Sequence, residues 1–164
     1  MKSLTSTRSI IGGDLNPKNL YSYGDRDGVL HEAKLQHPLA VHFVPEKNVV
    51  LVADTYNHKV KVVDPFRNEV FSWLGGQDSS QILLKDGTTS QSIFNEPQGI
   101  SSLYDDQAQD VKVFICDTNN HCIRCCHYDV GQISTLSFKG VPAPETPSVT
   151  NNNAATPADQ KLRA

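Results

Sequence analysis

The chain has 164 residues, 38% of them hydrophobic, and its 15 lysines and arginines against 18 aspartates and glutamates give a formal net charge of −3. This length suits about one domain. The negative balance argues against the broad basic surface with which proteins grip nucleic acid or an anionic membrane. No apolar run reaches the ~18 residues of a transmembrane helix, and the N-terminal residues lack the apolar stretch of a secretory signal.

All four cysteines lie between positions 116 and 126. Disulfide scaffolds usually spread their cysteines along the chain, so this crowding argues against one. No Asn-x-Ser/Thr glycosylation signal occurs either. We therefore expect a reducing, cytoplasmic compartment.

Strands are predicted along most of the chain, because short apolar or alternating runs are separated by turn-forming residues and no stretch has a sustained helical period. A first candidate, Arg8–Ile11, ends at Gly12-Gly13. Four strands are then expected at Leu39–Phe43, Val49–Ala53, Lys59–Val63 and Val70–Leu74. Four more are expected at Gly99–Leu103, Val111–Cys116, Cys122–His127 and Ile133–Leu136.

These two sets of strands belong to an internal repeat. Matching residues stand 59 positions apart at the start of each copy and 63 positions apart at its centre. They are Asp27-Gly28 and Asp86-Gly87, Pro38 and Pro97, Asp54-Thr55 and Asp117-Thr118, and Asn57-His58 and Asn120-His121. The four extra residues of the second copy fall in the acidic stretch Tyr104–Asp110, where we expect them to extend a surface loop.

Each copy has the pattern of a β-propeller blade, so the predicted fold class is all-β. Val49–Ala53 is apolar at every position, which predicts a strand covered on both faces. A four-stranded unit of roughly 40–50 residues, repeated in tandem, is typical of propeller blades. We assign residues 1–23 to the end of a preceding blade and a linker, 24–82 to blade 1, 83–140 to blade 2, and the Pro- and Asn-rich residues 141–164 to a disordered tail.

The repeated motif Asp-Thr-x-Asn-His follows an apolar strand in both copies, and a proline-led strand precedes it. This combination resembles the NHL-repeat family of propellers, although Lys59 and Cys122 stand where the third signature residue would be. Segments such as VLVADTYNHKVKVVDP and VFICDTNNHCI, within residues 8–138, are similar to the family of NHL repeat-containing protein 2. The resemblance implies a six-bladed propeller between a thioredoxin-like domain and a β-sandwich, neither of which is recognisable in this chain.

The motif residues are expected to build a tight hairpin turn. The Asp54 carboxylate can accept backbone N–H groups of the turn, and Asn57 tolerates a positive φ. His58 can then donate a hydrogen bond to a backbone or carboxylate oxygen. The same structural roles are expected in the second copy for Asp117, Thr118, Asn120 and His121.

The cysteines are predicted to act as small buried hydrophobic residues. Cys125 and Cys126 replace two valines of the first copy, and Cys116 replaces Ala53. Cys122 and Cys125 form a C-x-x-C pair, but residues three apart in a strand point to opposite faces. Redox chemistry or zinc binding through Cys122, Cys125 and Cys126 is therefore a minor alternative.

Other side chains suggest no stronger chemical site. His58 and His121 could ligate a metal or act as bases, but a repeated histidine in a repeated turn is more often structural. The segment Gly24–Gly28 resembles the start of a calcium loop, yet Gln36 stands at its twelfth position instead of Glu. A turn leading into each blade is the better interpretation, and we predict neither a metal site nor a cofactor.

The leading hypothesis is a non-catalytic scaffold that binds a protein partner, because blade-building residues occur without a catalytic set beside them. The loops at Tyr104–Asp110 and Gln77–Lys85 would carry that role. The runner-up is a thiol redox role linked to a thioredoxin-like domain. Binding of single-stranded RNA is a minor alternative, because the basic residues are scattered among acids. Two blades leave open faces and edges, so we expect association with further blades or self-association.

Overall fold

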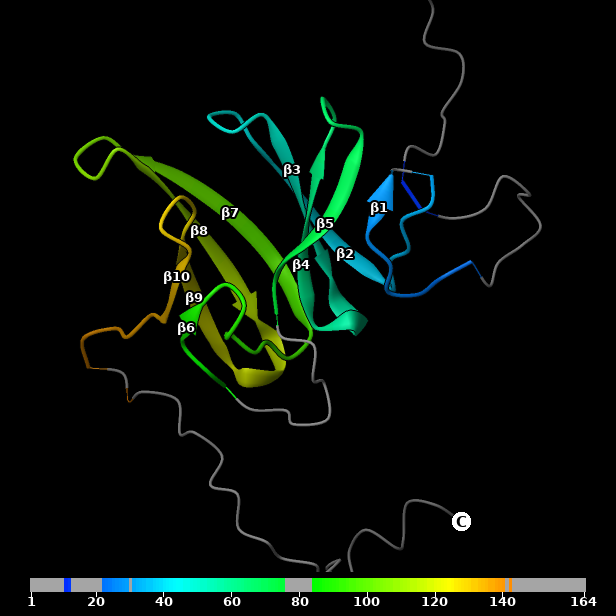
Figure 1. The fold of residues 1–164 in the computed structure, drawn as a ribbon. Coiled ribbons are helices and arrows are strands. Elements are labelled where there is room, and N and C mark those ends of the chain that lie inside the picture. The colour runs from blue at the N-terminus through cyan, green and yellow to red at the C-terminus, as the bar shows by residue number, and fades with distance from the viewer. Residues whose placement is uncertain (1–10, 13–21, 30, 76–83, 141, 143–164) are drawn as a thin grey trace, which may run out of the picture.

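The structure is a computed structural model that describes residues 11–12, 22–29, 31–75, 84–140 and 142. These residues form two antiparallel sheets of five strands each, which lie side by side (Figure 1). The predicted strand Arg8–Ile11 lies outside the described residues except for Ile11, and the predicted tail lies outside them except for Pro142. No helix in the described part of the chain is long and apolar enough to cross a membrane.

The two sheets have the same topology. The first has the strand order β1-β5-β4-β3-β2 and the second the order β6-β10-β9-β8-β7. The strands of the first sheet are β1 (Gly28–Val29), β2 (Pro38–Val44), β3 (Val49–Asp54), β4 (Lys59–Asp64) and β5 (Glu69–Leu74). Those of the second are β6 (Gly87–Thr88), β7 (Pro97–Asp105), β8 (Asp110–Asp117), β9 (Cys122–His127) and β10 (Gln132–Thr135).

The all-β fold and the eight repeated strands are confirmed, with ends that differ from those predicted by at most two residues. The expectation of four strands per blade is too low, because β1 and β6 add a short strand to the outer edge of each sheet. They pair with β5 and β10 through Gly28↔Val70 and Gly87↔Ile133. A strand of two residues is too short to produce an alternating pattern in the sequence.

The four extra residues of the second copy extend strands, so the prediction of a longer loop is wrong. Residues 45–48 and 106–109 form turns of equal length, whereas β7 and β8 are each two residues longer than β2 and β3. The added register pairs are Tyr104↔Val111 and Asp105↔Asp110. Burial of Val111 in the core favours this arrangement, and the resulting β7–β8 hairpin projects from its sheet (Figure 1).

The larger hydrophobic core lies between the two sheets. We call the face of each sheet that bears Leu51 or its counterpart Phe114 the front, and the opposite face the back. Since neighbouring residues of a strand point to opposite faces, the front of the first sheet packs on the back of the second. The fully buried residues that meet there include Leu51, Val60, Val62 and Leu74 from the first sheet and Phe94, Val113, Ile115 and Ile133 from the second.

A smaller core covers the back of the first sheet. It contains Val52, Val63 and Val70 from the strands and Ala33 from the segment that precedes β2, with Ile11 and Leu35 packed against it. The segment before β2 therefore supplies a cover for the outer part of its own sheet. The inner strand β2 leaves Leu39, Val41 and Phe43 exposed on this face.

Candidate functional site

The repeated motif forms a short 3-10 turn in each sheet. The turns are η1 (Thr55–Asn57), between β3 and β4, and η2 (Thr118–Asn120), between β8 and β9. Asp54 accepts hydrogen bonds from the Gln36 N–H at 2.6 Å and from the Asn57 side-chain amide at 2.8 Å. The carboxylate thus ties the turn to the segment before β2. The sequence had suggested that it would accept backbone N–H groups of the turn itself, and that prediction is wrong.

The second sheet repeats this arrangement. Asp117 accepts from the Asn95 N–H at 2.7 Å and from the Asn120 side-chain amide at 2.9 Å. In both sheets the positive φ of the turn falls on the histidine, with 55° at His58 and 54° at His121, and not on the asparagine. The histidine backbone N–H bonds back to the threonine carbonyl, which closes the turn.

The motif of the first sheet also connects the two sheets. The Thr55 hydroxyl donates to the Pro97 carbonyl at 2.8 Å, and the Nδ1 atom of His58 accepts from the Glu96 N–H at 3.1 Å. His58 is therefore a hydrogen-bond acceptor here, opposite to the donor role expected from the sequence. Its partner is the backbone that enters β7, so this motif joins one blade to the next.

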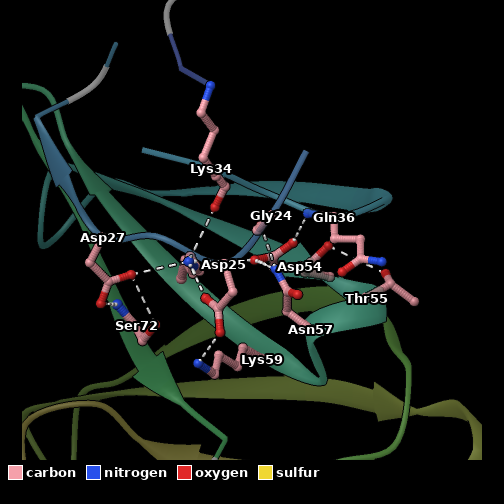
Figure 2. A network of polar contacts seen from close by, with 12 residues as sticks. Gly24, Asp25, Asp27, Lys34, Gln36, Asp54, Thr55, Asn57, Lys59 and Ser72 are labelled. Carbon is pink, nitrogen blue, oxygen red and sulfur yellow. Dashed lines mark hydrogen bonds and ion pairs between the residues drawn. The ribbon is translucent and has the colours of Figure 1, made fainter. Parts of the chain in front are cut away.

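A fully buried cation lies at the centre of each polar network. Lys61 of β4 and Arg124 of β9 both have side chains that are 0% exposed, and they stand 63 positions apart. The Lys61 ammonium lies 2.7 Å from Asp25, 3.1 Å from Asp27 and 3.6 Å from Asp54. Figure 2 shows these three aspartates converging from two segments. Such a charge is stable in the interior only when it is paired and hydrogen-bonded.

Arg124 is held by the equivalent residues of the second sheet. Its guanidinium lies 2.9 Å from both Asp86 and Asp117, and it also donates to the carbonyls of Lys85 and Ile93. The sequence analysis did not identify Lys61 and Arg124 as equivalent buried cations. The available signal was a basic residue at the same repeat position in two strands, KVKVVD and CIRCCH, with an apolar residue on each side of it.

The aspartate of each Asp-Gly turn links its buried cation to the outer part of the sheet. Asp27 accepts from the Ser72 N–H at 2.8 Å and from its hydroxyl at 3.0 Å. Asp86 makes the same pair of bonds with Thr135, at 3.0 and 2.8 Å. Asp25 and Asp27 thus pair with Lys61. Among the residues that the structure describes, no three His, Cys, Asp or Glu side chains gather as metal ligands.

The ionisation of this network follows from competition between burial and pairing. Burial opposes the charged form of Asp25, but hydrogen bonds from Lys59 and Lys61 outweigh it and lower the pKa of Asp25. Burial likewise opposes the charge on Lys61, but Asp25 and Asp27 raise its pKa. For Asp54, burial dominates and raises the pKa. The cation therefore stays charged at neutral pH.

The four cysteines are free and lie in different environments. Cys125 and Cys126 are buried and Cys122 is half-buried, but Cys116 is exposed, so the prediction of a buried Cys116 is wrong. The reason is its place on the front of the second sheet, which no other described sheet covers. Burial raises the pKa of Cys122 to about 11 and that of Cys126 to about 12. Cys122 pairs with Asp117 and Cys125 with Phe114, so the two cysteines lie on opposite faces.

Comparison with known proteins gives a consistent family relationship. The chain is 35% identical over 147 residues to NHL repeat-containing protein 2 of Gallus gallus, covering 90% of this chain and 19% of that protein. It is 37% identical over 131 residues to NHL repeat-containing protein 2 of Homo sapiens, covering 80% and 17%. It is also 34% identical over 162 residues to the Arabidopsis thaliana Protein SUPPRESSOR OF QUENCHING 1, chloroplastic, covering 95% and 14%. No protein-family model matches the chain.

The fold and the repeated Asp-Thr-x-Asn-His turns define tandem blades of an NHL-repeat β-propeller. The chain belongs to the family of NHL repeat-containing protein 2. It spans less than a fifth of the length of the curated relatives that it matches.

Replacing Lys61 by Met should destabilise the chain by about 3–5 kcal/mol at neutral pH, because the fully buried Asp54 carboxylate loses its cation, as do the more exposed Asp25 and Asp27. Lys61→Arg keeps the charge and should cost much less. The pKa of Lys61 is raised, so its stabilising effect is present below its ordinary pKa and is lost as the pH rises through the higher folded value. Urea denaturation followed by circular dichroism measures these differences.

The difference in unfolding free energy between the Lys61→Met variant and the original chain should become smaller as the pH falls. The pKa values of Asp25 and Asp27 are lowered in the original chain, so the stability they contribute is present above their ordinary pKa and is lost in acid. In the variant, protonation removes their unpaired charge. A gap that is independent of pH between 3 and 7 would contradict the network.

Thr55→Val should cost about 1–3 kcal/mol, because the buried Pro97 carbonyl loses its hydroxyl partner. The matched control is Thr118→Val, at the same repeat position but without a bond to another sheet, and its cost should stay within about 0.5 kcal/mol. Urea denaturation at low protein concentration measures both variants. Equal losses would show that the motif threonine does not join the sheets.

Proposed function

We propose that this chain is a non-catalytic scaffold that binds a protein partner through the projecting β7–β8 hairpin. The observation that carries the proposal is the two-residue extension of both strands, which lifts a structured hairpin above its sheet (Figure 1). Its tip, residues 106–109, is exposed, and Leu103 and Tyr104 add exposed apolar surface at its base.

Several contacts give the hairpin a defined shape. Asp105 accepts from the N–H groups of Gln107 and Ala108 and pairs with Lys112. The Lys112 hydrogen bond and the turn N–H groups lower the pKa of Asp105 to about 2. Because the carboxylate is charged throughout the neutral range, it keeps its pairing with Lys112 and its hydrogen bonds to the turn. A preorganised element binds a partner at a smaller entropic cost.

The base of the hairpin is anchored to both sheets. Asp110 accepts from the Asp129 N–H at 3.1 Å and lies 3.0 Å from the His127 ring. Asp129 in turn pairs with Lys47 of the first sheet at 2.6 Å, and the neighbouring Tyr128 ring packs at a tilt against Trp73, with 4.7 Å between the ring centroids. This anchoring supports a recognition element on a rigid base.

The same contacts support a non-catalytic role. The motif aspartates, the motif asparagines and His58 bond to the backbone, to other motif side chains or to the buried cations. These contacts support a structural role for the motif. Lys61 and Arg124 are buried in ion pairs, so they add nothing to a basic surface for RNA.

Four free cysteines support a reducing compartment such as the cytoplasm. The loop at Gln77–Lys85, the other predicted binding loop, lies outside the described residues except for Leu84 and Lys85.

Changing the hairpin surface should abolish partner binding. The variant Tyr104→Ser, Asp106→Ser, Gln107→Ser alters its exposed side chains and keeps Asp105 and Val111. The matched control is Glu46→Ser, in the equivalent turn of the first sheet. Quantitative cross-linking mass spectrometry should show proteins lost by the hairpin variant and kept by the control. If the original chain, the hairpin variant and the control were cross-linked to the same proteins, the hairpin would not be the binding element.

Thiol labelling tests the redox alternative. Exposed Cys116 should react first with iodoacetamide at pH 7.5, and Cys126 only after unfolding, because burial raises its pKa to about 12. Cys122, with a pKa raised to about 11, should react slowly as well. Peptide mass spectrometry at timed intervals measures each site. Rapid labelling of Cys122 or Cys125 would favour the redox role over the scaffold.

A further inference from the structure

The interface between the two sheets shows what each outer face of the chain is shaped to bind. Inside the chain, Thr55 and His58 on the front of the first sheet contact the backbone of Glu96 and Pro97, which leads into the second sheet. The repeat places an equivalent front on the second sheet and an equivalent leading strand on the first. Both halves of this interface therefore recur at the two ends of the pair of sheets.

The front of the second sheet presents the motif groups without a sheet to contact among the described residues. Thr118 is half-buried and His121 exposed, whereas Thr55 is buried. Phe114 and Ile123 are half-buried where their counterparts Leu51 and Val60 are fully buried. A cleft of about 750 Å³ lies over this surface, lined by residues that include Thr118, His121, Ile123, Leu136 and Phe138.

The back of the first sheet presents the complementary groups. His37 and Pro38 are exposed, whereas their counterparts Glu96 and Pro97 are half-buried and buried, respectively. His37 has the same φ of 51° as Glu96, so the backbone enters β2 with the conformation that His58 recognises at β7. Beside it, Val41 is 71% exposed, and Leu39 and Phe43 on the same face are exposed too. Apolar surface of this extent on one strand is typical of an interaction site.

We infer that the front of the second sheet binds the back of the first sheet of a second copy of this chain, head to tail. Thr118 then donates to the Pro38 carbonyl of the second copy, and the His121 ring accepts from its His37 N–H. The apolar side chains of β2 cover the front cleft. A second copy fits because one chain carries both halves of an interface whose geometry is already formed within it. The two halves are different surfaces, so the contact is heterologous and each copy can bind two others.

Sedimentation velocity of the full chain in dithiothreitol tests this pairing. The original chain should form dimers and larger species as its concentration rises. Val41→Asp places a charge on the back of the first sheet and should prevent that face from binding. Leu103→Asp does the same on the front of the second sheet, at a position that is 60% exposed. Each variant alone should be monomeric. The control Val130→Asp, at a turn position 74% exposed, should associate like the original chain.

Mixing the two monomeric variants provides the sharpest result. Val41→Asp retains a usable front and Leu103→Asp a usable back, so an equal mixture should form dimers and no larger species. Dimers of Val41→Asp by itself would indicate symmetric contacts and overturn the proposal. A folded original chain that stays monomeric up to 200 µM, or one whose association needs disulfides, would overturn it as well.

Labelling of Cys116 gives a second, independent readout of the same contact. This exposed thiol lies on the front of the second sheet, where its counterpart Ala53 is fully buried. Its rate of alkylation should fall several-fold as the chain associates and should stay high in Val41→Asp at the same concentration. An unchanged rate in the associated protein would place the contact elsewhere and refute the proposal.

Discussion

The buried cation of each sheet is the interaction on which the rest of the structure depends. A lone charge in a protein interior costs several kcal/mol, so Lys61 and Arg124 must be met by carboxylates from separate segments. Asp27 or Asp86 comes from the turn before the blade, and Asp54 or Asp117 from the end of an inner strand. Satisfying one charge thereby fixes the leading turn, the motif turn and the outer strand of the same blade.

The buried cations of the two blades are neutralised by different sets of partners. The Lys61 ammonium is a compact charge and is surrounded by three aspartates, including Asp25, which also binds Lys59. The forked Arg124 guanidinium reaches two carboxylates and two carbonyl oxygens, and only its Nε atom lacks a hydrogen bond among the described residues. Leu84 and Cys122 stand in the second blade where the first has Asp25 and Lys59. The additional acid is therefore absent together with the additional lysine.

Much of the fold could be predicted from the sequence because its signals are local. Apolar strands such as Val49–Ala53 and a repeat of about 60 residues identify blades before any contact is known. The site was less accessible. The motif was expected to stabilise its own turn, but Thr55 and His58 bond to the backbone of the next sheet, a contact between residues 38 or more positions apart. The exposure of Cys116 likewise depends on which sheet lies opposite and not on its strand.

The sequence by itself determined the repeat, the alternation of the strands and the choice of turn residues, because each of these depends on neighbouring residues. Only the tertiary structure decided what those residues contact. It showed that the extra residues at Tyr104–Asp110 extend two strands, since Val111 gains burial in the core between the sheets. It also paired Lys61 and Arg124 with aspartates distant in the chain, because a buried charge is stabilised by whichever carboxylates the fold brings within bonding distance.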